Sequence, residues 1–176
     1  MASDPNAPAV TREELERLAI LAAANIEALE PMLLACPVRK LARGETLITI
    51  GTENKNLYLV LSGELGVHLD SPDSPALTKL GAGEAAGELS LIDRQPASAY
   101  VVASLATRVL VLDEELLWLL ADSSHAVAYN LLRTLAARMR SGNKIIQRER
   151  EQLEQYKFHA SIDSLTGLFN RYWMDK

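Results

Sequence analysis

The pattern of apolar and polar positions divides the chain into three parts, and the first of these is helical. Thr11 followed by Glu14 is a capping-box pattern, which predicts the start of a helix in which Leu15, Leu18 and then Leu21 or Ala22 follow at helical spacing. A second helix is expected from about residue 26 to residue 34, before Pro37 ends the helical region. We expect both helices to pack against a neighbouring sheet.

The second part, between Val38 and Asp113, has the pattern of short strands. Its segments are rich in Val, Ile, Leu and Tyr and are separated by turn residues such as glycine and proline. The seven segments are VRKLA, TLITI, LYLVLSG, ELGVHL, ALTKL, SAYVVA and RVLVL. Their spacing predicts a compact antiparallel barrel or sandwich, and with the flanking helices an α+β fold. ELSLI, directly after Gly87, is the one break in this pattern.

The third part, from Asp113 onward, is helical again. Asp113 is a candidate N-cap for one helix, and Ser123 or Ser124 for a longer one. Apolar residues then recur every seven positions, at Leu132, Met139, Ile146, Leu153 and Ala160. This spacing favours a parallel coiled coil, although the companion positions are poorly apolar. The alternative is a single helix lying on its own domain, for which residues 144–157 have few apolar side chains.

Composition narrows the classes of partner. The chain has 18 Lys+Arg against 23 Asp+Glu, so no net positive field attracts nucleic acid or an anionic membrane surface. Cys36 is the single cysteine, which excludes a disulfide within the chain and agrees with a reducing, cytoplasmic compartment. Residues 1–10 lack the features of a signal peptide, and we interpret them as a disordered tail. No apolar stretch is long and unbroken enough to cross a bilayer, so no membrane partner is expected.

Spaced glycines and the GEL triplet carry a family resemblance. The residues are Gly44, Gly51, Leu57 to Val60, Ser62, Gly63, Leu80, Gly81, Gly83, Gly87 to Leu89, Ala99, Leu112 and Asp113. In this order they resemble a cyclic-nucleotide-binding domain of the catabolite-activator type, over roughly residues 12–140. The resemblance implies an antiparallel β-roll of the jelly-roll type with N-terminal helices. It also implies a short phosphate-binding helix between two strands and a long C-terminal helix that forms a homodimer.

A second resemblance lies at the C-terminal end, in DSLTGLFNR at residues 163–171. This segment is similar to the opening motif of GGDEF diguanylate cyclase domains. The signature that gives those domains their name does not follow, so GTP and Mg²⁺ would belong to a domain that is missing here. We therefore divide the chain into a tail (1–10), a nucleotide-binding-like domain (11–140), a coiled-coil signalling helix (141–162) and the truncated start of a cyclase domain (163–176).

The resemblance also names candidate ligand-binding residues. In the family, a glutamate at the place of Glu88 accepts hydrogen bonds from the ribose, and an arginine grips the phosphate. Here Ala97 stands at the place of that arginine. The candidates are Gly87, Glu88, Leu89, Ser90, Arg94, Ala97, Ser98, Ala99 and Asn143. Arg94 is a candidate substitute cation. Asn143 either contacts a base edge or fixes the register of a coiled coil.

The missing arginine affects affinity. Hydrogen bonds to charged groups contribute roughly 1.5 to 3 kcal/mol each, so cyclic AMP affinity falls by about tenfold to more than a hundredfold. Ala85 and Ala86 replace two bulky apolar residues of the family, which leaves either a roomier pocket or one filled from elsewhere.

The three histidines, His68, His125 and His159, lack ligand spacing, so no metal site is expected.

Two functions of different classes fit these observations. The first is a sensor that binds a small nucleotide-like ligand and controls a diguanylate cyclase through a dimeric helix. The second is a degenerate roll that binds no nucleotide and serves as a scaffold for dimerisation or protein docking. A transcription factor is a weaker third reading, because residues 161–176 do not resemble a helix-turn-helix domain. No grouping of residues indicates catalysis in this fragment, so we expect no enzyme activity from it.

Overall fold

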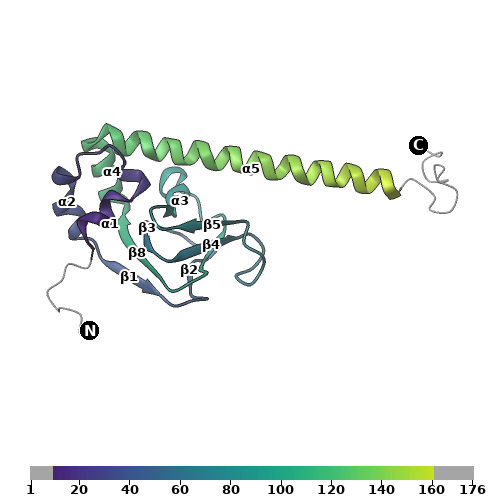
Figure 1. Cartoon of the computed structure of the whole chain (residues 1–176), viewed down its shortest axis with the longest axis horizontal. Helices are drawn as coiled ribbons and strands as arrows, with labels where there is room; N and C mark the ends of the chain where they lie inside the picture. The colour runs from purple at the N-terminus through teal and green to yellow at the C-terminus, as the bar shows by residue number, and fades with distance from the viewer. Residues whose placement is uncertain (1–9, 161–176) are drawn as a thin grey trace. The chain divides into compact units, whose positions relative to one another are not determined.

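The structure is a computed structural model that describes residues 10–160. The predictions for residues 1–9 and for DSLTGLFNR concern residues outside this range. In chain order the elements are α1 (Arg12–Glu16), η1 (Ala19–Leu21), α2 (Ile26–Leu34), β1 (Val38–Leu41), β2 (Thr46–Ile48), β3 (Asn56–Ser62), β4 (Glu64–His68), β5 (Thr78–Gly81), β6 (Ala85–Ala86), α3 (Glu88–Asp93), β7 (Tyr100–Ala103), β8 (Thr107–Asp113), α4 (Glu114–Ser123) and α5 (His125–Ala160). Figure 1 shows α1, α2 and α4 gathered at one end of a β-roll.

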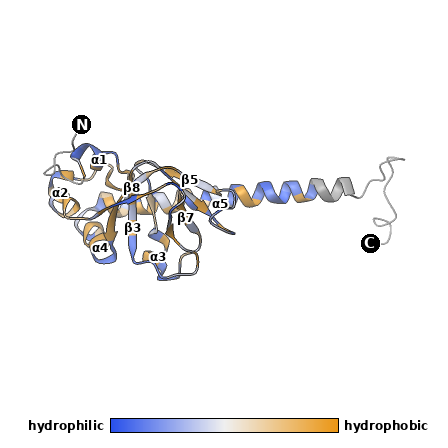
Figure 2. Cartoon of the chain, turned by 90° about the horizontal axis from the view of Figure 1, so that it is seen from below, coloured by the Kyte–Doolittle hydropathy of each residue, from blue (hydrophilic) through white to orange (hydrophobic). Residues whose placement is uncertain are grey.

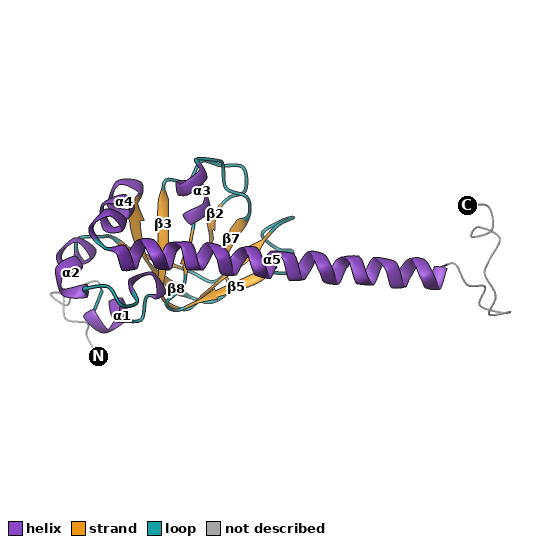
Figure 3. Cartoon of the chain, turned by 90° about the horizontal axis from the view of Figure 1, so that it is seen from above, coloured by secondary structure: helices purple, strands orange, loops and turns teal. Residues whose placement is uncertain are grey.

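The roll consists of two four-stranded antiparallel sheets. One sheet has the order β1-β8-β3-β6, and the other has the order β2-β7-β4-β5. Strands that are distant in the sequence therefore lie side by side, as β3 and β8 do from Asn56 opposite Asp113 to Ser62 opposite Arg108. This architecture, with N-terminal helices and a long C-terminal helix, confirms the predicted α+β jelly-roll fold (Figure 3).

β3 lies at the centre of the packing and is buried on both faces. Leu57, Leu59 and Leu61 belong to the core that includes the helices. Tyr58 and Val60 belong to the core between the two sheets. The alternation follows from the period of two along a strand, with apolar residues on both sides because both faces are covered. One continuous apolar segment thus joins the two cores.

The N-terminal helices confirm one prediction and correct another. Thr11 forms the expected capping box with Glu14, and α2 spans the expected residues. The first helix, however, ends at Glu16, and the leucines that follow it form the short 3-10 turn η1. The reason is a tertiary contact, because the Ala19 N–H donates to the Gly83 carbonyl at 2.8 Å. Val10, the last residue of the expected tail, is buried in the core with 1% of its surface exposed.

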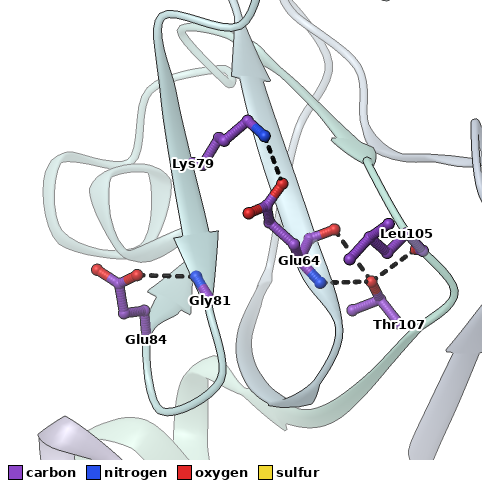
Figure 4. A network of polar contacts seen from close by, with 6 residues as sticks. All are labelled: Glu64, Lys79, Gly81, Glu84, Leu105 and Thr107. Atoms are coloured by element: carbon purple, nitrogen blue, oxygen red, sulfur yellow. Dashed lines mark hydrogen bonds and ion pairs between the residues drawn. The ribbon is translucent and has the colours of Figure 1, made fainter.

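Seven predicted strands are present, and an eighth was missed. β6 consists only of Ala85 and Ala86, which pair with Leu59 and Tyr58 of β3. Two alanines carry no strand signal of their own, so no local pattern predicts this element. Near the turn between β3 and β4, the Thr107 hydroxyl joins strands β4 and β8. It donates to the carbonyl of Glu64 at 3.0 Å and accepts from the Glu64 N–H at 3.0 Å (Figure 4).

The C-terminal helices begin where the caps indicate. The Asp113 carboxylate accepts a hydrogen bond from the Leu116 N–H at 2.8 Å, which confirms it as the N-cap of α4. α5 begins at His125, directly after Ser124. The chain divides within α5 into two units, between Leu132 and Arg133. The domain boundary that we expect at residue 140 stays a prediction. None of the described helices is long and apolar enough to cross a membrane.

Candidate ligand-binding site

The candidate site is the segment from Gly87 to Ala99, which contains α3 and the loop that leads to β7. Gly87 is the N-cap residue of α3 and has φ 92°, in the left-handed region that favours glycine. A Cβ atom at this position would lie 2.6 Å from the carbonyl oxygen of Asn56 and 2.7 Å from the side-chain nitrogen of Asn54. Gly87 is therefore required both for the turn into α3 and for close approach to the neighbouring loop, beside β2 and β3 (Figure 3).

Asn54 connects this turn to the loop between β2 and β3. Its side-chain Nδ2 donates to the carbonyl of Gly87 at 3.2 Å and to the carbonyl of Asn56 at 2.8 Å. Its Oδ1 accepts from the Asn56 N–H at 3.3 Å. Sequence reasoning missed Asn54 and Asn56, because the signal was only a short polar stretch after Gly51. The bond to Gly87 ties the start of α3 to the roll, and the two bonds to Asn56 fix the conformation of the loop that carries Asn54.

The first three residues of α3 face two environments. Glu88 is fully buried, with 0% of its surface exposed, and its Oε2 atom is itself enclosed by protein. Ser90 is also buried, whereas Leu89 is 44% exposed. A carboxylate is strongly unfavourable in a protein interior unless hydrogen bonds or charges compensate for lost water. The burial of Glu88 is therefore a property that apolar packing alone does not account for.

Ala97 lies in the inter-sheet core, with 6% of its surface exposed. Its backbone forms two hydrogen bonds with the β2–β3 loop: its N–H donates to Thr52 at 2.9 Å, and its carbonyl accepts from Gly51 at 2.8 Å. Ser98 is exposed, and Ala99 is half-buried. The loop after α3 is thus fixed by main-chain contacts, and the small side chain at position 97 is used for core packing. Ala86, one of the two alanines before Gly87, belongs to the same core.

Arg94 ends α3 with a left-handed conformation, at φ 55°. Its guanidinium Nη2 lies 3.7 Å from the Glu114 carboxylate at the start of α4, and its side chain is 83% exposed. Ion pairs this exposed contribute little to stability. The structure therefore places the candidate substitute cation beside Glu114, on the solvent side of the segment.

Asn143 lies on α5 in the second compact unit, and its side chain is exposed. The other eight candidates all belong to the first unit, between residues 87 and 99. These eight are neighbours in the sequence, and in the structure they face different environments, with Ala97 in the core and the Arg94 side chain exposed. The contribution of Asn143 to a ligand site stays a prediction.

An open groove of about 420 Å³ lies on the sheet that contains β4, β5 and β7, and none of the nine candidates lines it. Its lining residues are Arg43, Gly44, Glu64, His68, Pro72, Lys79 and Val102 to Leu105. The Lys79 ammonium pairs with the Glu64 carboxylate at 2.9 Å across this region (Figure 4). Over residues 10–160, no three His, Cys, Asp or Glu side chains come together in a way that would hold a metal ion.

Comparison with known proteins gives consistent matches. The family model for the cyclic nucleotide-binding domain matches residues 38–124. The chain is 30% identical over 132 residues to the CRP-like cAMP-activated global transcriptional regulator of Mycobacterium tuberculosis, covering 70% of this chain and 59% of that protein. It is 36% identical over 104 residues to the Cyclic AMP receptor protein of Thermus thermophilus, covering 57% and 48%.

Solved structures show the same relationship. A cyclic nucleotide-binding domain from Methylobacillus flagellatus superposes with a TM-score of 0.66 at 31% identity, covering 77% of this chain and 84% of that one. The Thermus thermophilus catabolite activator protein gives a TM-score of 0.63 at 30% identity, covering 75% and 63%. The chain therefore belongs to the family of cyclic nucleotide-binding domains, and it is of the catabolite-activator type. It spans 59% of the length of the Mycobacterium tuberculosis regulator that it matches.

Proposed function

We propose that this chain is the sensor of a larger signalling protein and that a small nucleotide-like ligand binds at residues 87–99. The observation that carries the proposal is the fully buried Glu88 carboxylate at the first position of α3. Carboxylate oxygens accept hydrogen bonds, and ribose hydroxyls are donors of suitable size and chemistry. Membership of the cyclic nucleotide-binding family supports the same assignment.

The ligand would be held without the usual arginine at position 97. Because Ala97 is packed in the core, the phosphate contacts would come from other groups of the segment. Arg94 is the nearest candidate in the sequence, and its exposed 3.7 Å pair with Glu114 is weak enough to be exchanged for a phosphate. We therefore expect affinity for cyclic AMP to be lower than in a domain that has the arginine.

The proposed output is a change in a paired α5 helix. Four residues at heptad spacing are exposed on this helix, Leu132 by 66%, Met139 by 71%, Ile146 by 57% and Leu153 by 53%. We refer to these four residues as the α5 seam. Exposed apolar residues at this spacing favour a homodimer through a parallel coiled coil. Asn143 lies beside the seam, where a polar residue fixes register.

The proposed target of the sensor is a diguanylate cyclase domain that begins at DSLTGLFNR. That domain would bind GTP and Mg²⁺ and form cyclic di-GMP, and this chain would itself have no catalytic role. For coupling, the ligand must bind two arrangements of the dimer with different affinity. The test is the rate of cyclic di-GMP formation by the longer protein, with and without ligand. An unchanged rate at saturating ligand would remove this part of the proposal.

The burial of Ala86 and Ala97 favours a second candidate, a scaffold that binds no nucleotide. If small side chains fill the place where a ligand phosphate would lie, the fold is retained for dimerisation or protein docking alone. The two candidates predict different responses to an arginine at position 97.

Cyclic AMP is titrated into the wild-type chain and into Ala97→Arg, with calorimetry as the readout. The sensor predicts that the variant binds about ten- to a hundredfold more tightly. The scaffold predicts no heat from either protein. Because Ala97 is buried, thermal unfolding first confirms that the variant is folded. If it is not folded, Arg94→Ala replaces it, for which the sensor predicts weaker binding than in the wild type.

A further inference from the structure

A row of exposed cations runs along α5, on the side opposite the α5 seam. Residues 133–148 contain five basic residues and no acidic residue. Residues 1–132 have the reverse balance, with nine Lys+Arg against eighteen Asp+Glu. Residues 133–148 thus carry a net positive charge, whereas residues 1–132 carry a net negative one. Figure 2 shows hydrophilic positions dominating the ribbon of this helix, with hydrophobic positions recurring between them.

Four of the five basic residues share one face. With 3.6 residues per turn, Arg133, Arg140, Lys144 and Arg148 fall within about 80° of the helix circumference. Their average direction is about 145° from that of the α5 seam, and at 1.5 Å per residue they extend over about 22 Å. We call these four residues the cationic stripe. A dimer formed through the seam would leave both stripes on its outside.

The cationic stripe is accessible and has no internal counter-ions. All four side chains are exposed. Among the ion pairs of residues 10–154, none includes any of the four. Glu149, Glu151 and Glu154 come after the stripe, and Glu151 is hydrogen-bonded to Gln147 at 3.2 Å. Four like charges in line repel one another, so an anionic partner would gain from all four at once.

We propose that the cationic stripe is a docking surface for an acidic α-helix of a partner protein. The spacing of seven, four and four residues repeats the period of a helix, so carboxylates at the same spacing on an antiparallel helix meet all four cations. Three of the four are arginines, which pair with carboxylates through two parallel hydrogen bonds.

Two other anionic partners fit less well. An amphipathic helix on a membrane surface inserts its apolar face, but here the apolar seam and the stripe lie on nearly opposite sides. Proteins that bind single-stranded nucleic acid combine cations with aromatic side chains on which the bases stack, but the four residues of the stripe include no aromatic side chain. Both partners are included as outcomes of the test.

The test uses two synthetic helical peptides of identical composition. The matched peptide carries four glutamates at positions i, i+4, i+8 and i+15. This is the spacing of the stripe in reverse order, as an antiparallel helix would present it. The control peptide carries them at every fifth position, which distributes them around the helix. Binding to the full chain is measured by fluorescence anisotropy at low salt. We expect the matched peptide to bind about tenfold more tightly, because only it aligns all four pairs.

Charge-neutralising variants locate the effect. Glutamine at Arg133, Arg140, Lys144 and Arg148 keeps helix propensity and should abolish the preference for the matched peptide. The matched control places glutamine at four exposed cations of the first unit, Arg17, Lys40, Arg43 and Lys55, and should retain it. Circular dichroism confirms that both variants keep their helix content.

Three results would overturn the proposal. The first is equal binding of the two peptides, or no binding of either, which would make the stripe a solvated face only. The second is a preference for the matched peptide that survives in the stripe variant. The third is tighter binding of a single-stranded DNA 20-mer or of anionic lipid vesicles than of the matched peptide.

Discussion

The side-chain amide of Asn130 donates to the carbonyl oxygens of Ala22, at 2.7 Å, and Ile20, at 3.2 Å. Asn130 lies near the start of α5 and is 5% exposed. The two carbonyls belong to η1 and to the residue after it, just before Ala23 turns the chain at φ 60°. Because η1 is also bonded to Gly83 through Ala19, one segment contacts both the start of α5 and the turn that precedes β6.

We predict that Asn130→Ala destabilises the fold by about 1 to 3 kcal/mol, because the carbonyl oxygens of Ile20 and Ala22 lose their donor and the Ile20 hydrogen bond is buried. Chemical denaturation gives the free energy of unfolding. Tyr129→Ala is the matched control, since Tyr129 is the preceding residue and is 56% exposed, and it should change stability by less than about 0.5 kcal/mol. Equal effects of the two substitutions would show that the Asn130 contacts contribute nothing specific.

A second prediction compares two glycines. Gly87→Ala should destabilise the chain by about 1 to 3 kcal/mol, because it combines a left-handed φ of 92° with a 2.6 Å approach to the Asn56 carbonyl. Gly142→Ala should stabilise α5 by about 0.5 to 1 kcal/mol, since nothing lies within 4 Å of the new Cβ. Thermal unfolding measures both. The same sign for both variants would argue against the conformation assigned to Gly87.

Cys36 provides a pH-dependent prediction. Burial, and after it the charge of Asp113, raises the pKa of the Cys36 thiol. The folded chain thus holds the thiol proton more tightly than the unfolded chain, so this contribution to stability is present at neutral pH. It is lost as the pH rises through and above the pKa of an unfolded thiol, about 8.5.

Thermal unfolding at neutral and alkaline pH tests this for the wild type and for Cys36→Ala. The wild type should lose more stability on going to alkaline pH than the variant does. Alkylation of Cys36 by iodoacetamide should also be slow in the native chain and fast in denaturant. A native rate equal to the denatured rate would contradict the burial of this thiol.

The α5 seam predicts the oligomeric state. Ile146→Glu places a charge at the centre of the seam and should convert the dimer to a monomer, as measured by analytical ultracentrifugation. Gln147→Glu adds the same charge next to the seam and is the control that should stay dimeric. A wild-type chain that is monomeric at all concentrations would remove the proposed dimer.

The sequence predicted those parts of the fold that have local signals. The Thr11 capping box, the Asp113 cap and the short apolar segment that forms β3 each depend on a few adjacent residues, and each was confirmed. The end of α1 was wrong because it depends on a hydrogen bond between Ala19 and Gly83, which are distant in the sequence. β6 was missed because two alanines pair only through the context that β3 supplies.

The candidate site was predicted only in part for the same reason. The GEL triplet located α3, and Gly87 has the conformation that a glycine there favours. The contact of Asn54 with Gly87 joins residues 33 positions apart and leaves no pattern in the sequence. The core packing of Ala97 depends on the closure of two sheets. Neither property follows from the spacing of residues along one strand.

The most direct test of the central claim is a calorimetric titration of the chain with cyclic AMP, cyclic GMP and cyclic di-GMP, each to millimolar concentration. We predict saturable heat from at least one of them, with one binding site per chain. The Glu88→Ala variant should lose that heat. A thermal unfolding measurement first confirms that this variant is folded. Absence of heat from all three ligands with the wild-type chain would contradict the account and leave the scaffold as its function.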